Sequence, residues 1–235
     1  DDPRARWPVW VLPAILIGCT SLGVSLLLLS GQQDPVPHEQ PKAAASVSIP
    51  TEPPTEWISL FDGETLQNWQ VVERYAGRLL RWGSGKGGRV RVEDGRIVFE
   101  HGDPATGIIF TGKFPTEDYE IELDAMRVED GSDCPGIVFP VGNEWCRFVV
   151  GWGNRAVGLD LVDDQPAGGN ITTRHMTVPN GRWYNVRLRV TRQKIEAWLE
   201  QQKVVDLARA GHRFTVQYGY PDNALGLHCM GNEVV

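Results

Sequence analysis

The sequence predicts an all-β sandwich or barrel for the larger, C-terminal part of the 235-residue chain. From Trp57 onward, short runs of alternating apolar and polar residues recur at close spacing, and turns rich in Gly, Asn and Asp separate them. No apolar period of 3.6 residues lasts long enough for a major helix. The composition agrees, because Gly (26) and Trp (9) are both abundant, as is typical of turn-dense β proteins.

The clearest strands lie in 182–207, where Tyr184, Val186, Leu188 and Val190 share one face. The chain then turns twice, which predicts a three-strand meander with one buried face. The expected strands are Trp57–Phe61, Trp69–Val72, Arg89–Glu93, Arg96–Glu100, Gly107–Phe110, Asp118–Val128, Gly136–Pro140, Trp145–Gly151, Ala156–Leu161, Thr172–Val178, Arg182–Thr191, Lys194–Glu200, Lys203–Leu207, Thr215–Tyr218 and Leu225–Cys229.

An uncharged stretch, Trp7–Ser30, comes before this body. As a helix rising about 1.5 Å per residue, it is long enough to cross a hydrocarbon core of about 30 Å. Arg4 and Arg6 precede it, so the positive-inside rule places everything after Ser30 outside the cytoplasm. Two alternatives stay open: a lipoprotein in which Cys19 is lipidated, and a cleaved signal peptide. All three place the body outside the cytoplasm, and the first predicts a single-pass protein of the cell membrane.

The chain therefore divides into a membrane anchor (1–30), a Pro-rich linker (31–55) and a body (56–235). The linker is rich in Pro and small polar residues, which bury too little surface to fold, so we expect a semi-extended tether.

Charge and cysteine content exclude some classes. Lys+Arg is 23 and Asp+Glu is 30, for a net charge of −7, so a nucleic-acid partner is not expected. There is no C-x-x-C motif and the histidines are scattered without ligand spacing, so no metal site is predicted from them.

Two segments resemble known proteins. The opening, Trp57–Trp69, reads WISLFDGETLQNW and resembles the start of the 3-keto-disaccharide hydrolase domain family, "sLFdGk-sLdgW". Val92–Ile97 and Asp118–Leu123 are similar to that family's "vedG-l" and "dFel-le". The meander, with W-x-x-V-x-x-x-V, looks like the core of concanavalin A-like jelly rolls. The resemblance implies a concanavalin A-like jelly-roll β-sandwich, here preceded by one transmembrane helix and the linker. That family's terminal strand lies beyond Val235, so we expect the chain to be a fragment.

Three acidic residues of one expected strand, Glu120, Glu122 and Asp124, are the first candidates for chemistry. Residues i and i+2 share a face of a strand and lie about 6.6 Å apart, so two carboxyls there suit a glycosidase acid–base pair. The alternative is a solvated strand face opposite Ile121 and Leu123.

A second candidate region runs from Arg147 to the loop at Asn170. Trp152, flanked by two glycines, offers an aromatic face on which a sugar ring stacks. Asp160, Asp163 and Asn170 offer hydrogen bonds to sugar hydroxyls, and the same three oxygen ligands would suit a weak calcium site. No other cofactor is expected. The alternative is a core or edge Trp beside a bulge.

The resemblance implies the cleavage of 3-keto-glycosides. A ketone at carbon 3 acidifies the hydrogen at carbon 2, a base removes it, and the glycosidic oxygen leaves from carbon 1. On this interpretation Glu122 is the base, Arg147 stabilises the enolate, and Trp152, Asp160, Asp163 and Asn170 hold the sugar. Two alternatives to an enzyme remain: a non-catalytic carbohydrate-binding module and an interaction domain for an envelope partner.

Overall fold

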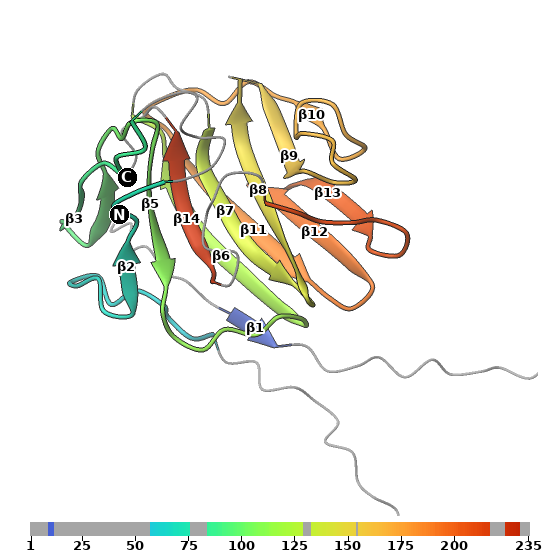
Figure 1. Ribbon diagram of the computed structural model, residues 1–235, viewed down its shortest axis with the longest axis horizontal. Helices are drawn as coiled ribbons and strands as arrows, with labels where there is room; N and C mark the ends of the chain where they lie inside the picture. Colours follow the sequence, from blue (N-terminus) through green and yellow to red (C-terminus); the bar gives the residue numbers. More distant parts are fainter. Residues whose placement is uncertain are drawn as a thin grey trace, which may run out of the picture.

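Two β-sheets stacked on one another form the body of the protein (Figure 1). The structure, a computed structural model, describes residues 9–11, 57–75, 84–128, 133–153, 155–216 and 224–230. Within these ranges it contains strands and turns but no α-helix. The prediction of an all-β sandwich is therefore confirmed for the body of the chain.

The smaller sheet has five strands in the order β1-β6-β11-β12-β13, each antiparallel to its neighbours. The last three are the predicted meander, and Tyr184, Val186, Leu188 and Val190 all face the core. The strands are β1 (Val9–Val11), β6 (Tyr119–Met126), β11 (Trp183–Val190), β12 (Lys194–Leu199) and β13 (Gln202–Ala208).

The larger sheet has seven strands in the order β10-β9-β8-β7-β14-β5-β2. β14 lies between β7 and β5, so a strand near the end of the chain completes the middle of this sheet (Figure 1). The strands are β2 (Trp69–Val71), β5 (Ala105–Phe110), β7 (Asp133–Val141), β8 (Glu144–Trp152), β9 (Ala156–Asp160), β10 (Arg174–His175) and β14 (Gly226–Met230). A separate hairpin pairs β3 (Val90–Glu93) with β4 (Arg96–Phe99).

The inner faces of the two sheets form one hydrophobic core. On β8 this core takes Cys146, Phe148 and Val150, and on β14 it takes Leu227 and Cys229. Side chains alternate along a strand, so the residues between these must point to the outer face of the seven-stranded sheet. That outer face is covered as well, since Arg147, Val149 and His228 are also buried.

Within the described residues two expected strands are absent and a third is reduced to two residues, whereas the other expected strands differ only at their ends. Trp57–Phe61 is irregular, because this segment is fixed by side chains: the Trp69 indole N–H donates to Leu60 O at 2.8 Å, and Phe61 is buried. Of Thr172–Val178 only Arg174–His175 is a strand, since side-chain hydrogen bonds around Asn170 hold the start of the segment in turns. Thr215 and Val216 form no strand, and the remainder of Thr215–Tyr218 lies outside the described residues.

Most of the predicted anchor (1–30) and all of the linker (31–55) lie outside the described residues. The exception is β1, where Val9–Val11 pairs with Tyr119–Ile121 at the edge of the five-stranded sheet. The described residues contain no candidate for a membrane-spanning helix.

Candidate functional site

The outer face of the seven-stranded sheet carries a buried ion pair between neighbouring strands. Arg147 on β8 lies directly opposite Asp160 on β9, and Arg147 Nη1 is 3.3 Å from Asp160 Oδ2. Their exposed fractions are 0% and 4%. Removing two charges from water costs several kcal/mol each, which a single ion pair offsets only in part. A pair kept at that cost is a candidate for function rather than for stability.

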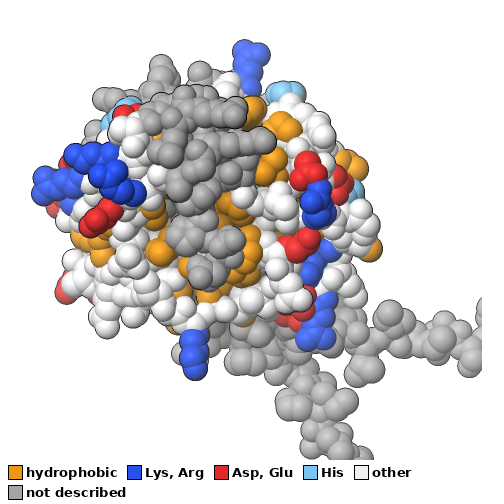
Figure 2. Space-filling model, in the orientation of Figure 1, with side chains coloured by type: hydrophobic (Ala, Val, Ile, Leu, Met, Phe, Trp, Pro, Cys, Tyr) orange, Lys and Arg blue, Asp and Glu red, His pale blue; other side chains and the backbone are white. Residues whose placement is uncertain are grey.

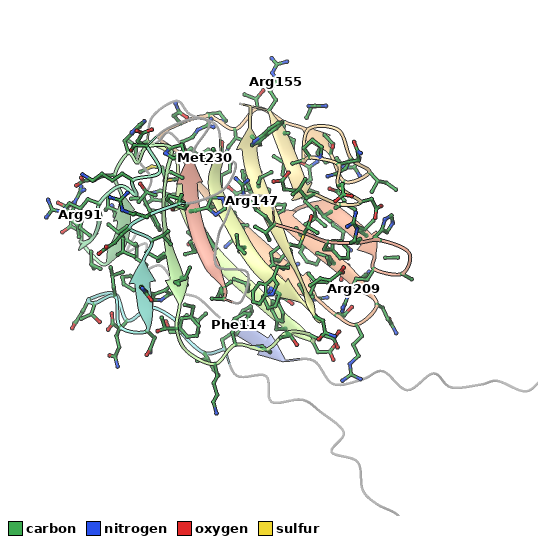
Figure 3. All side chains as sticks on the ribbon, viewed as in Figure 1. Arg91, Phe114, Arg147, Arg155, Arg209 and Met230 are labelled. Atoms are coloured by element: carbon green, nitrogen blue, oxygen red, sulfur yellow. The ribbon has the colours of Figure 1, made fainter. Side chains whose placement is uncertain are left out.

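Arg147 extends across the sheet from β8 toward β14. Its Nη2 lies 4.0 Å from Met230 Sδ, so the side chain crosses β7, which separates the two strands. In Figure 3 Arg147 lies over the middle of the sheet, with Met230 toward the end of β14. The guanidinium group therefore lies over the centre of the face rather than at its edge.

His228 on β14 shares this face. It pairs with Gly136 on β7, and a Cβ atom on Gly136 would overlap the His228 imidazole ring, so the ring lies across the bare backbone of Gly136. On the other side His228 pairs with Gly107, whose missing Cβ leaves room for the Tyr75 hydroxyl group. Glycine on both sides of His228 is what admits these large polar side chains onto a flat sheet.

An apolar cluster surrounds the polar groups on this face. It is formed by the buried residues Val72, Tyr75, Ala105 and Val138, with Ile109, Trp145, Val216 and Met230 packed against it. An apolar wall with a few convergent polar groups is the usual composition of a small-molecule site.

The loop after β9 is tied to the same ion pair. Asp160 Oδ1 accepts a hydrogen bond from the Ala167 N–H at 3.0 Å, so one carboxylate fixes both Arg147 and the loop. The Asn170 amide donates to Leu159 O at 2.7 Å and accepts from Thr172 N–H at 2.9 Å. Asn170 is thus occupied in shaping the loop.

The other two predicted sugar-binding residues lie at the rim. The Trp152 ring is half-buried and covers Gly168, where a Cβ atom would come within 2.7 Å of ring atom Cζ3. Asp163 is exposed; its carboxylate accepts from the Arg213 N–H at 2.9 Å and lies 2.7 Å from His212 Nδ1. The Arg213 N–H and then His212 lower the pKa of Asp163.

The structure does not bring Glu122 and Arg147 together. Glu122 lies on β6 and faces outward from the five-stranded sheet, where its Oε1 accepts from Asn185 Nδ2 at 2.9 Å. The core separates it from Arg147. Two groups on opposite outer faces of a sandwich cannot act on one sugar, so the structure offers no common site for the expected base and enolate stabiliser.

The outer face of the five-stranded sheet is instead an ionic network around Trp198. Arg187 Cζ lies 4.1 Å from the Trp198 ring centroid and Lys203 Nζ lies 5.1 Å from it. Glu120 pairs with Arg189 at 2.7 Å, and Glu196 accepts from Lys194 at 2.8 Å. These charges satisfy one another, so the acidic strand faces outward as the alternative interpretation expected, but Glu120 and Glu196 are buried beneath their Arg and Lys partners rather than solvated.

His228 is the residue that the sequence argument passed over. In the sequence it is only one of several histidines without ligand spacing. The alternation Leu227–His228–Cys229 already puts it opposite to the core. The sequence does not show that only one strand, β7, separates β14 from β8 in the sheet.

The residues that the structure describes contain no group of three or more His, Cys, Asp or Glu side chains placed to hold a metal ion. The proposed calcium ligands each have protein partners: Asp160 binds Arg147, Asp163 binds Arg213, and Asn170 binds Thr172.

The chain belongs to the family described as the 3-keto-alpha-glucoside-1,2-lyase-like domain, whose model matches residues 56–234. It is thus a domain of the carbohydrate-active, glycosidase-like class, and the predicted family resemblance is confirmed. No curated protein matches the chain.

Several solved structures match the chain at low sequence identity. The carbohydrate-binding module CBM66 from Bacillus subtilis is 12% identical with a TM-score of 0.44, over 72% of this chain and 91% of that one. Domain 4 of AbnA, an extracellular arabinanase from Geobacillus stearothermophilus, is 14% identical with a TM-score of 0.43, over 71% and 78%. A β-1,3-1,4-glucanase from a mouse hindgut metagenome is 8% identical with a TM-score of 0.42, over 70% and 80%.

Proposed function

We propose that the domain cleaves the glycosidic bond of 3-keto-glycosides on the outer face of the seven-stranded sheet, with Arg147 and His228 as the reacting groups. The observation that carries this proposal is that Arg147, held by Asp160, extends over the sheet toward the strand that bears His228. Family membership supports the same substrate class, because the family is named for a 1,2-lyase of 3-keto-α-glucosides, that is, for an elimination across carbons 1 and 2 that breaks the bond between carbon 1 and the glycosidic oxygen.

The reaction needs two groups, a general base and a group that stabilises the enolate. The ketone at carbon 3 makes the carbon 2 hydrogen acidic, and His228 takes that proton as general base, since histidine is the side chain best suited to proton transfer near neutral pH. The electron pair left on carbon 2 is delocalised onto the carbon 3 oxygen, where the Arg147 guanidinium offers positive charge and hydrogen bonds. The pair then forms the carbon 1–carbon 2 double bond as the glycosidic oxygen leaves carbon 1 and takes up the proton that His228 removed, which returns the histidine to its basic form. Addition of water to the product completes a hydrolysis.

The ion pair with Asp160 orients the Arg147 guanidinium group for this step. An arginine fixed by a carboxylate keeps its remaining N–H groups aimed at one place and needs little reorganisation when negative charge develops. The apolar wall of Val138, Tyr75 and Ala105 lowers the local dielectric, so that charge interaction is stronger than it would be in water.

A second candidate function is carbohydrate binding without turnover. One observation favours it: Arg147 and His228 have exposed fractions of only 0% and 2%, so a sugar reaches them only after local opening of the face. If the face stays closed, saccharide would bind at the rim near Trp152 and would not react.

A time course with a 3-keto-disaccharide labelled with deuterium at carbon 2 separates the two functions. The elimination predicts release of the leaving sugar, loss of the label to water and a slower rate than for the unlabelled substrate. Retention of the intact sugar without label loss would instead support the binding module. Absence of both binding and turnover would contradict both proposals.

We also propose that the stretch 7–30 anchors the domain outside the cytoplasmic membrane, with Val9–Val11 leaving the edge of the five-stranded sheet when the stretch inserts. The length of the stretch, its lack of charge and the preceding arginines support this proposal. The test is fractionation of the full chain followed by protease treatment of intact cells: the body should be in the membrane fraction and cleaved from outside.

A further inference from the structure

A pocket of about 390 Å³ lies between the loop that precedes β3 and the loop between β4 and β5. Its lining carries the basic side chains Lys86 and Arg89, together with His101 and Asp103. The whole chain has a net charge of −7, whereas the two permanent cations of this pocket outnumber its one carboxylate. Figure 2 shows Lys and Arg side chains gathered at the edge of the molecule where β3 lies.

The floor of this pocket is fixed by glycine. A Cβ atom on Gly87 would overlap Val72 O, one on Gly88 would overlap Glu100 O, and one on Gly102 would overlap Ala105 O. Only glycine allows these segments to approach so closely, and the pocket is therefore a built feature of the fold.

The cations at the pocket are kept near one another without compensation. Lys86 pairs across the backbone with Arg74 on one side and with Asp103 on the other. Like charges directly opposite destabilise a β pairing, yet Arg74, Lys86 and Arg89 have no hydrogen-bond or ion-pair partner for their side chains anywhere in the described ranges. Asp103 does not neutralise Lys86, because its carboxylate instead accepts from the Ser84 N–H at 2.9 Å. That hydrogen bond is the main cause of its lowered pKa.

The backbone adds donors at the same place. The N–H of Gly87 is taken by Glu73 O at 2.8 Å, whereas those of Gly88 and Arg89 donate no hydrogen bond within the part of the chain that the structure describes. Unpaired N–H groups beside two cations form a concavity suited to an oxyanion.

The pocket adjoins the candidate site. Its Gly102 packs against Ala105, and Ala105 pairs with Met230, the residue that the Arg147 guanidinium reaches. We infer that the pocket is a subsite for an anionic substituent, a carboxylate or sulfate group, of the saccharide held on the sheet face. This inference rests on the proposed function, since it names the class of saccharide, an acidic one, that the site prefers.

Amide NMR of the full chain tests this subsite. The probes are a disaccharide that ends in glucuronate, its uncharged glucose counterpart, and inorganic sulfate. The glucuronate probe should shift the amide signals of Gly88 and Arg89 and bind about tenfold more tightly than the glucose counterpart, the scale of one solvent-exposed charge-assisted hydrogen bond. Sulfate alone should bind weakly at the same amides.

The Lys86→Gln, Arg89→Gln double variant should lose this preference and keep the wild-type fold, because both side chains are exposed and unpaired in the described ranges. The matched control is Lys113→Gln, which changes an exposed lysine elsewhere on the surface and should keep the preference for the glucuronate probe. The two single variants serve if the double variant does not fold. Equal affinity for the two disaccharides, or a preference that survives removal of both cations, would overturn the subsite. If sulfate binds as tightly as the glucuronate probe does, the saccharide contributes nothing to binding. The pocket would then be a site for a free anion and not a saccharide subsite.

Turnover of an uncharged 3-keto-disaccharide, measured in parallel, separates the two proposals. Turnover without acidic preference overturns the subsite alone, and acidic preference without turnover overturns the proposed cleavage alone.

Discussion

Arg147 Nη1 and Asp160 Oδ2 are 3.3 Å apart on paired positions of β8 and β9, and neither side chain has more than a few per cent of its surface in water. Asp160 also receives the Ala167 N–H, so a single carboxylate links the arginine at the centre of the face to the loop at its rim. The account of function depends on this relationship, because it determines where the guanidinium points.

Asp160→Asn should destabilise the fold strongly, since it leaves the Arg147 charge buried without its counter-ion. Breaking one partner of a buried pair costs about 3–5 kcal/mol. Urea denaturation followed by Trp fluorescence measures the change. Asp163→Asn is the control, because Asp163 is exposed, and it should change the stability much less than Asp160→Asn does. Equal losses in the two variants would show that Arg147 does not rely on Asp160.

Gly136→Ala should displace His228. The added Cβ atom would overlap the imidazole, so the ring has to move, and overpacking of this kind costs about 1–3 kcal/mol. The expected result is a lower melting temperature and a changed His228 ring signal in NMR. Gly169→Ala is the matched control, since nothing lies within 4 Å of its Cβ position. An unchanged His228 signal in Gly136→Ala would show that the imidazole ring does not lie over Gly136.

The sequence predicted the sandwich, the meander and two of the central polar residues, because alternation along each strand decides which side chains face the core. It did not predict the pairing of strands that are distant in sequence. The acidic strand illustrates this: the spacing of Glu120 and Glu122 was interpreted correctly as one shared face, but the face belongs to the other sheet from Arg147. His228 was missed for the same reason, because its position beside β7 follows from topology and leaves no local pattern.

Glu196 should make stability depend on pH. Burial raises its pKa, but hydrogen bonds from Lys194 and Lys203 outweigh burial and lower the pKa below the ordinary 4.5. A lowered folded-state pKa stabilises the fold above pH 4.5, and this contribution is lost as pH falls through the folded-state pKa.

Glu196→Gln should therefore cost about 1–2 kcal/mol at pH 7, and its difference from the wild type should shrink below pH 4.5. Denaturation at pH 7 and in steps below 4.5 measures this. Glu64→Gln, at an exposed position outside the ionic network, is the control and should behave as the wild type throughout. A stability difference between Glu196→Gln and the wild type that grows as the pH falls would contradict the lowered pKa of Glu196.

The most direct test of the account compares the rate of 3-keto-disaccharide cleavage in three variants of the full chain. His228→Asn and Arg147→Lys should each lower the rate by about 10²-fold or more, the usual scale for loss of a general base or of an oxyanion donor. Glu122→Gln, on the other face of the sandwich, should leave the rate within about twofold of the wild type. Cleavage abolished by Glu122→Gln and undiminished by His228→Asn would contradict the placement of the reaction on the seven-stranded sheet.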